Sequence, residues 1–158
     1  MNATDHLHLR RCVDLARESL DAGDEPFGSC LVDRDGIRRF EDRNRVAGGD
    51  ATQHPEFAIA RWAARHMTPE QRASATVYTS GEHCPMCAAA HGWVGLGRIV
   101  YAGSSEQLGE WLMEIGASAA PVAPLPIQAI VPGAIVDGPA PEFADELRSL
   151  HHRLHSKG

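Results

Sequence analysis

The chain lacks any apolar run that approaches the length of a membrane-spanning helix. Such a helix needs about 20 consecutive apolar residues, so we expect no integral membrane segment. The polar beginning, from Met1 to His6, also lacks the character of a signal peptide. No internal repeat or low-complexity segment is apparent. At 158 residues, the sequence predicts one cytoplasmic domain spanning residues 1–158.

A strong basic cluster is also missing. The formal net charge is −6, and the basic pairs Arg10-Arg11 and Arg38-Arg39 are short and lie among acidic residues. Proteins that hold a nucleic-acid backbone usually gather lysine and arginine to neutralise its phosphates. The charge pattern therefore favours a small neutral ligand over DNA or tRNA.

Cysteines are few, and their placement suggests no disulfide framework. Of the four, Cys12 and Cys30 lie in apolar contexts, which agrees with a reducing compartment. The other two, Cys84 and Cys87, belong to a Cys-Pro-Met-Cys motif. This motif lies thirty residues after a His-Pro-Glu motif at residues 54–56.

Together, the two motifs offer three metal ligands and one further carboxylate. A structural zinc site takes four protein ligands, whereas a catalytic one keeps three and leaves the fourth position to water. The count here stops at His54, Cys84 and Cys87, with Glu56 two residues after the histidine. The pattern predicts one catalytic Zn²⁺ per chain, with Glu56 as the acid/base group.

The residues around both motifs indicate helix starts. His54 and Cys84 each precede a proline, which is favoured at the first helical position. Cys84 and Cys87 are three apart and so share one side of the first turn. The positive end of a helix stabilises thiolates and carboxylates. We expect two helix starts that face each other across the metal.

Two plainer interpretations of the cysteines compete with this one. A C-x-x-C pair can be a redox couple or part of a structural zinc site. Neither alternative explains His54 and Glu56, so the two motifs taken together favour the catalytic site.

Hydrophobic spacing and turn signals predict alternating helices and strands. A hairpin followed by such an alternation favours an α/β fold, with a mixed sheet of about five strands and helices on both faces. The fourth strand is expected to run parallel to the third. We expect helices at 4–22 (capped by Thr4 or Asp5), 55–67, 69–72, 85–94, 105–115 and 142–155, and strands at 29–32, 37–44, 75–79, 98–102 and, weakly, 128–131.

The motifs resemble the cytidine deaminase superfamily of zinc-dependent base deaminases, whose signature is H-x-E followed by P-C-x-x-C. Residues 54–56 match the first half, and residues 79–87 match the longer form T-S-x-E-x-C-P-M-C. His83 departs from the signature, which has proline there. The resemblance covers residues 5–115, looks closest to bacterial guanine deaminases, and implies a three-layer α/β/α fold.

The resemblance also implies a reaction. Glu56 would accept a proton from water and pass it to the substrate ring, and ammonia would leave. The implied substrate is a free nucleobase, namely guanine or a related aminated purine, pyrimidine or triazine. A nucleoside, a nucleotide or a tRNA adenosine is the alternative, and a non-catalytic zinc-stabilised binding module is a second one.

Four residues are implied as substrate contacts, each with a plainer alternative. Asn44 would hydrogen-bond the base, or simply form a turn. Phe27 is a pocket wall or part of the core. Trp93 is a pocket aromatic or packs at the helix end. Glu114, with Glu110 as its alternative, would contact the far edge of a purine.

Other polar residues are expected to have structural roles. For Glu82 we expect local hydrogen bonding instead of metal ligation. His151, His152 and His155 favour a solvated helix face over a metal site. Similar bacterial deaminases are dimers, so we expect a homodimer in which the arm and helix at 117–156 pack on a partner subunit.

Overall fold

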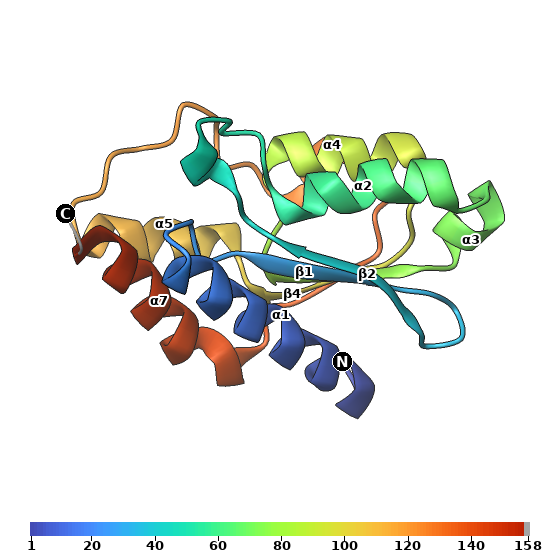
Figure 1. The fold of residues 1–158 in the computed structure, drawn as a ribbon, viewed down its shortest axis with the longest axis horizontal. Coiled ribbons are helices and arrows are strands. Elements are labelled where there is room, and N and C mark those ends of the chain that lie inside the picture. Colours follow the sequence, from blue (N-terminus) through green and yellow to red (C-terminus); the bar gives the residue numbers. More distant parts are fainter. Residues whose placement is uncertain (157–158) are drawn as a thin grey trace.

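In the computed structural model, which describes residues 1–156, a five-stranded sheet lies between two layers of helices (Figure 1). The strand order is β2-β1-β3-β4-β5. β1 pairs antiparallel with β2 and β3, whereas β3 pairs parallel with β4, and β4 with β5. The mixed sheet and the three-layer α/β/α arrangement are therefore confirmed. The strands are β1 (Gly28–Val32), β2 (Arg38–Arg43), β3 (Thr76–Gly81), β4 (Ile99–Gly103) and β5 (Val136–Asp137).

The helices divide between the two faces of the sheet. α2 and α4 pack together above one face, while α1, α5 and α7 cover the other (Figure 1). Short helices and turns connect these elements. The bounds are α1 (Ala3–Asp21), η1 (Val46–Gly48), α2 (Pro55–His66), α3 (Pro69–Ala73), α4 (Pro85–Val94), α5 (Ser105–Glu114), α6 (Ile127–Ile130), η2 (Pro141–Phe143) and α7 (Ala144–Ser156).

Alternation along the central strands divides the core in two. In β1, Cys30 belongs to the cluster on the α1 side, whereas Leu31 belongs to the cluster on the α2 side. In β3, Tyr78 and Val77 divide in the same way. Successive side chains of a strand point to opposite faces. This places Ser29 and Thr79, two residues from Leu31 and Val77, on the face that α2 covers.

Side-chain caps begin several helices. Thr68 and Ser104 form the expected capping boxes with Gln71 and Gln107. The first helix starts earlier than predicted, because Asn2 is its cap and Asp5 completes the capping box from inside the first turn.

The prediction of a strand near residues 128–131 was wrong. Residues 127–130 form the helix α6, and the fifth strand is at Val136–Asp137. Ile127 is fully buried with Ala88 and Ile99, so this short helix fills the space beside α4. Tertiary packing therefore outweighs the β-propensity of an Ile- and Val-rich stretch.

The C-terminal helix α7 packs against other elements of the same chain. Residues 117–126 form an arm that arches away from the body of the molecule and is exposed from residue 118 onward (Figure 1). Beyond it, α7 packs on α1 and α5, burying Leu147 and Leu150. Packing of this segment on a partner subunit remains a prediction. No helix within residues 1–156 has the length and apolar character to cross a bilayer.

Candidate active site

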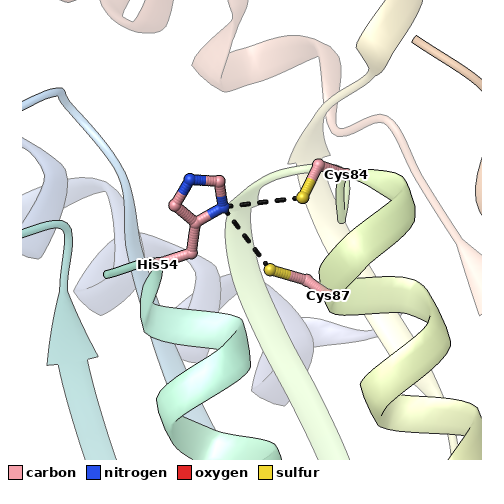
Figure 2. A group of neighbouring side chains, drawn as sticks. All are labelled: His54, Cys84 and Cys87. Carbon is pink, nitrogen blue, oxygen red and sulfur yellow. Dashed lines mark hydrogen bonds between the residues drawn. The ribbon is translucent and has the colours of Figure 1, made fainter. Parts of the chain in front are cut away.

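Three side chains converge where α2 and α4 begin. His54 Nδ1 lies 3.5 Å from the Sγ atoms of both Cys84 and Cys87 (Figure 2). All three donor atoms lie within 4.8 Å of one another. Within residues 1–156, no other three or more histidine, cysteine or acidic side chains gather in this way.

The local backbone explains the convergence. His54 is the N-cap of α2 and Cys84 the N-cap of α4, and both have extended backbone angles before a proline. Neither side chain caps its own helix. Both are thus free to turn toward the neighbouring helix, and Cys87 joins them from the first turn of α4.

The spacing of these donors fits zinc. Zinc lies about 2.3 Å from thiolate sulfur and about 2.0–2.1 Å from imidazole nitrogen in tetrahedral geometry, so sulfur and nitrogen should lie about 3.6 Å apart. The observed distance is 3.5 Å for both His–Cys pairs. A donor set of one imidazole and two thiols also suits this metal.

The three donors alter one another's pKa values. The hydrogen bond between the Cys87 and Cys84 side chains lowers the pKa of Cys84 to about 4. The pKa of Cys87 is raised, chiefly because it shares this hydrogen bond with Cys84. The Cys84 sulfur also raises the pKa of His54. A bound dication would favour deprotonation of both thiols.

Glu56 lies beside the donor group and belongs to the first turn of α2. Its side chain is only 6% exposed, and its negative charge contributes to the raised pKa of Cys87. Glu56 Oε1 accepts hydrogen bonds from Ser29 Oγ at 2.9 Å and Thr79 Oγ1 at 2.8 Å. Burial raises the pKa of Glu56, although both hydroxyls oppose the shift. A carboxyl with a raised pKa is suited to general acid–base catalysis.

Asn44 and Phe27 make local contacts. Asn44 is 1% exposed; its Oδ1 accepts from Val46 N at 3.1 Å, an arrangement typical of a turn-forming Asn. The Phe27 ring lies against the imidazole of His151, with ring centroids 5.1 Å apart. Phe27, Trp111 and His151 help to line a cavity of about 20 Å³.

The structure does not bring Trp93 into the site. Trp93 is 90% exposed near the end of α4. Six residues of helix correspond to a rotation of about 600°, so the side chains of Trp93 and Cys87 point about 120° apart around the helix axis.

Glu114 is likewise held elsewhere. It is the last residue of α5 and pairs with Arg148 at 2.8 Å and His152 at 3.1 Å. Glu114 is separated from Ser105, the first residue of α5, by about 14 Å along the helix axis. The alternative acid, Glu110, is exposed.

Several polar residues have contacts that the sequence only partly indicated. Glu82 has the expected local role, since it accepts from the backbone N–H groups of Ser105 and Ile127, both at 3.0 Å. The pairing of Ser29 with Thr79 was not predicted, because it depends on strand register. The expected solvated face was wrong for His151, which is only 5% exposed.

Two deaminases are similar to this chain over part of their length. A probable cytosine deaminase of Schizosaccharomyces pombe is 32% identical over 108 residues, covering 68% of this chain and 65% of that protein. A guanine deaminase of Bacillus subtilis is 38% identical over 96 residues, covering 60% of this chain and 61% of the relative. The matches therefore span less than two thirds of each relative.

A solved structure extends the likeness in fold to most of the chain. A guanine deaminase from Nitrosomonas europaea matches with a TM-score of 0.71 and 19% identity, covering 94% of this chain and 83% of that one. The family described as the cytidine and deoxycytidylate deaminase zinc-binding region matches residues 2–103, which include the donor group and Glu56. On that match, together with the fold and the spacing of its donors, the chain belongs to this deaminase family.

Proposed function

We propose that the protein is a zinc-dependent hydrolytic deaminase of a free nucleobase, with guanine or a related aminated heterocycle as its substrate. The observation that carries this proposal is a three-donor group at two helix starts with the buried carboxyl of Glu56 beside it. A structural zinc site would use a fourth protein ligand. A binding module would have no use for an acid/base group at that position.

The chemistry requires a polarising cation and a proton carrier. Zinc held by His54, Cys84 and Cys87 would act as a Lewis acid that acidifies water. Glu56 accepts a proton as the water oxygen attacks the amine-bearing ring carbon, and it then protonates a ring nitrogen. It also assists proton delivery to the departing amine. A C–O bond forms, the C–N bond breaks, and the two water protons end on the ring nitrogen and in ammonia.

The choice of base is supported by resemblance and by charge. The Bacillus subtilis relative is a guanine deaminase, whereas the Schizosaccharomyces pombe relative is a probable cytosine deaminase. A net charge of −6 disfavours a polyanionic substrate. Asn44 and Phe27 are our candidates for contact with the base, by resemblance to the deaminase family.

An ammonia-release panel tests the proposal. The zinc-loaded protein is incubated with guanine, other aminopurines, cytosine and an amino-triazine, then with matching nucleosides, nucleotides and an adenosine-containing RNA stem-loop. Release from a free base, absent in Glu56→Gln, is the expected result. Ammonia release only from nucleosides, nucleotides or RNA would show that the substrate is not a free base. One bound zinc without any ammonia release would favour the non-catalytic binding module.

We also propose that the chain forms a homodimer. Residues 118–126 of the arm are exposed, and Val122 and Leu125 within them are exposed large apolar side chains, as are Trp93 in α4 and Met113 in α5. Light scattering at micromolar concentration should give twice the chain mass, and a monomer would contradict the proposal.

A further inference from the structure

A pair of hydroxyl groups from the middle of the sheet surrounds one oxygen of Glu56. Ser29 and Thr79 both lie within hydrogen-bonding distance of Oε1, and their own oxygens are 2.9 Å apart. Both residues are completely buried. The three polar groups therefore form a closed triangle within the protein, beneath the start of α2.

The sheet register produces this triangle. Ser29 of β1 and Thr79 of β3 are direct partners in the antiparallel ladder. Directly opposite residues present their side chains on the same face of a sheet. Their neighbours Cys30 and Tyr78 point to the α1 side and join its apolar cluster. Two adjacent strands thus aim a pair of hydroxyls at the single carboxyl that α2 inserts between them.

The hydroxyls of Ser29 and Thr79 have more hydrogen-bond acceptors within reach than they have protons to donate. Each hydroxyl donates only one hydrogen bond. Thr79 Oγ1 is 2.8 Å from the Gly81 carbonyl as well as 2.8 Å from Glu56 Oε1. Ser29 and Thr79 can both donate to Oε1, or Ser29 can donate to Thr79 while Thr79 donates to Gly81. Each buried hydroxyl therefore has an acceptor in either arrangement.

We propose that Ser29 and Thr79 are positioning residues for Glu56. They engage Oε1 and fix the plane of the carboxyl, so that Oε2, which accepts from neither hydroxyl, exchanges protons with water and substrate. The inference rests on the proposed deaminase function. It adds that the orientation of Glu56 depends on the β1–β3 pair as well as on α2.

Paired variants at Thr79 separate positioning from packing. Thr79→Val keeps the shape and removes the donor, whereas Thr79→Ser keeps the donor and removes a methyl group. Misplacing a catalytic group by about 1 Å can cost about 10²-fold in rate. We expect zinc-loaded Thr79→Val to lose about 10- to 100-fold in kcat with KM within about threefold of the wild type. Thr79→Ser should retain kcat within about threefold.

Two further variants complete the test. Thr76→Val makes the same change in β3 on the opposite face of the sheet, and its kcat should match the wild type. Ser29→Ala removes the second donor and tests the same claim if Thr79→Val is too unstable to purify. A folded, zinc-loaded Thr79→Val or Ser29→Ala enzyme with wild-type kcat would overturn the proposal.

A crystallographic measurement distinguishes failure of this inference from failure of the proposed function. In the crystal structure of Thr79→Val, the Glu56 carboxyl should rotate away from its wild-type plane, whereas Thr79→Ser should preserve that plane. This comparison holds even if the wild-type protein releases ammonia from no base, a result that would contradict the proposed function alone. An unmoved Glu56 in Thr79→Val would contradict the positioning role.

Discussion

Burial shifts the pKa values of buried acidic and basic side chains in opposite directions. It raises the pKa of Glu56, since removal from water penalises a carboxylate. The same removal lowers the pKa of the imidazoles of His83, His91 and His151. These residues are thus biased toward neutral forms, and Glu56 combines this bias with a carboxyl group beside the metal donors.

Replacing Glu56 tests the acid/base role. Glu56→Gln keeps the volume and an oxygen that can accept from Ser29 and Thr79, but an amide cannot carry the transferred proton. We expect unchanged zinc content and a kcat reduced by about 10²- to 10⁴-fold, measured by ammonia release. Glu106→Gln, at an exposed position in α5, is the control and should remain active. Activity of Glu56→Gln close to that of the wild type would refute the role.

His151 makes a separate prediction about stability and pH. Burial lowers its pKa to about 4 in the folded chain, whereas an unfolded histidine titrates near about 6.5. Between these values the unfolded state binds more protons, so the free energy of unfolding falls as pH decreases from about 6.5 toward 4. His151→Phe should show a shallower fall than the wild type.

Urea unfolding at pH 7, 6 and 5 measures that slope. The other buried histidines and the metal ligands titrate in both proteins, so their effects cancel in the difference. His66→Phe, at an exposed position of α2, does not contribute to the lowered pKa of His151 and should keep the wild-type slope. Equal slopes for His151→Phe and the wild type would show that His151 does not drive the pH dependence.

At the scale of elements, close packing of helices on the sheet sets where the site residues lie. Gly28 begins β1 immediately before Ser29, and α1 crosses it closely. A Cβ at Gly28 would lie 2.4 Å from the Leu15 Cβ and 2.5 Å from the Cys12 carbonyl oxygen. Glu82 similarly holds the first turns of α5 and α6 together, because its two carboxylate oxygens accept hydrogen bonds from backbone N–H groups of both helices. Both features position backbone segments at the same end of the sheet.

Gly28→Ala should therefore destabilise the fold. The added methyl group has to displace α1, and overpacking of this kind costs about 1–3 kcal/mol. Gly109→Ala is the matched change, because nothing lies within 4 Å of its Cβ and the residue is inside α5. Replacing a helical glycine by alanine should stabilise by up to about 1 kcal/mol. Urea unfolding of both variants measures the contrast, which equal stabilities would contradict.

At the scale of the whole molecule, four elements supply the site. α2 and α4 provide the metal donors, and β1 and β3 provide the hydroxyls that hold Glu56. A metal ion bound here would link helix starts that are thirty residues apart in sequence. Zinc binding should consequently stabilise the tertiary structure as well as support chemistry.

Removing the metal should lower the unfolding temperature. A ligand present at 1,000 times its Kd stabilises the native state by about 4 kcal/mol. Dialysis against a chelator should lower the midpoint in scanning calorimetry, and added zinc should restore it. Cys87→Ala, which loses one donor, should respond much less to either treatment. An identical response of this variant and the wild type would place the stabilising metal elsewhere.

The sequence by itself determined the features that depend on near neighbours. The proline after each of His54 and Cys84 indicated the helix starts, and the Thr68 and Ser104 capping boxes were correct. Strand and helix alternation also predicted the mixed sheet. These signals lie within a few residues of one another, so their physical causes are local.

Only the tertiary structure decided the contacts between distant residues. The pairing of Ser29 with Thr79 depends on strand register, which no local pattern specifies when both faces of a strand are buried. His151 is buried because α7 packs over Phe27 and Trp111, although most residues of α7 are polar. Residues 127–130 became a helix because Ile127 fills a space beside α4. In each case, burial against a distant segment outweighs the preference of the local sequence.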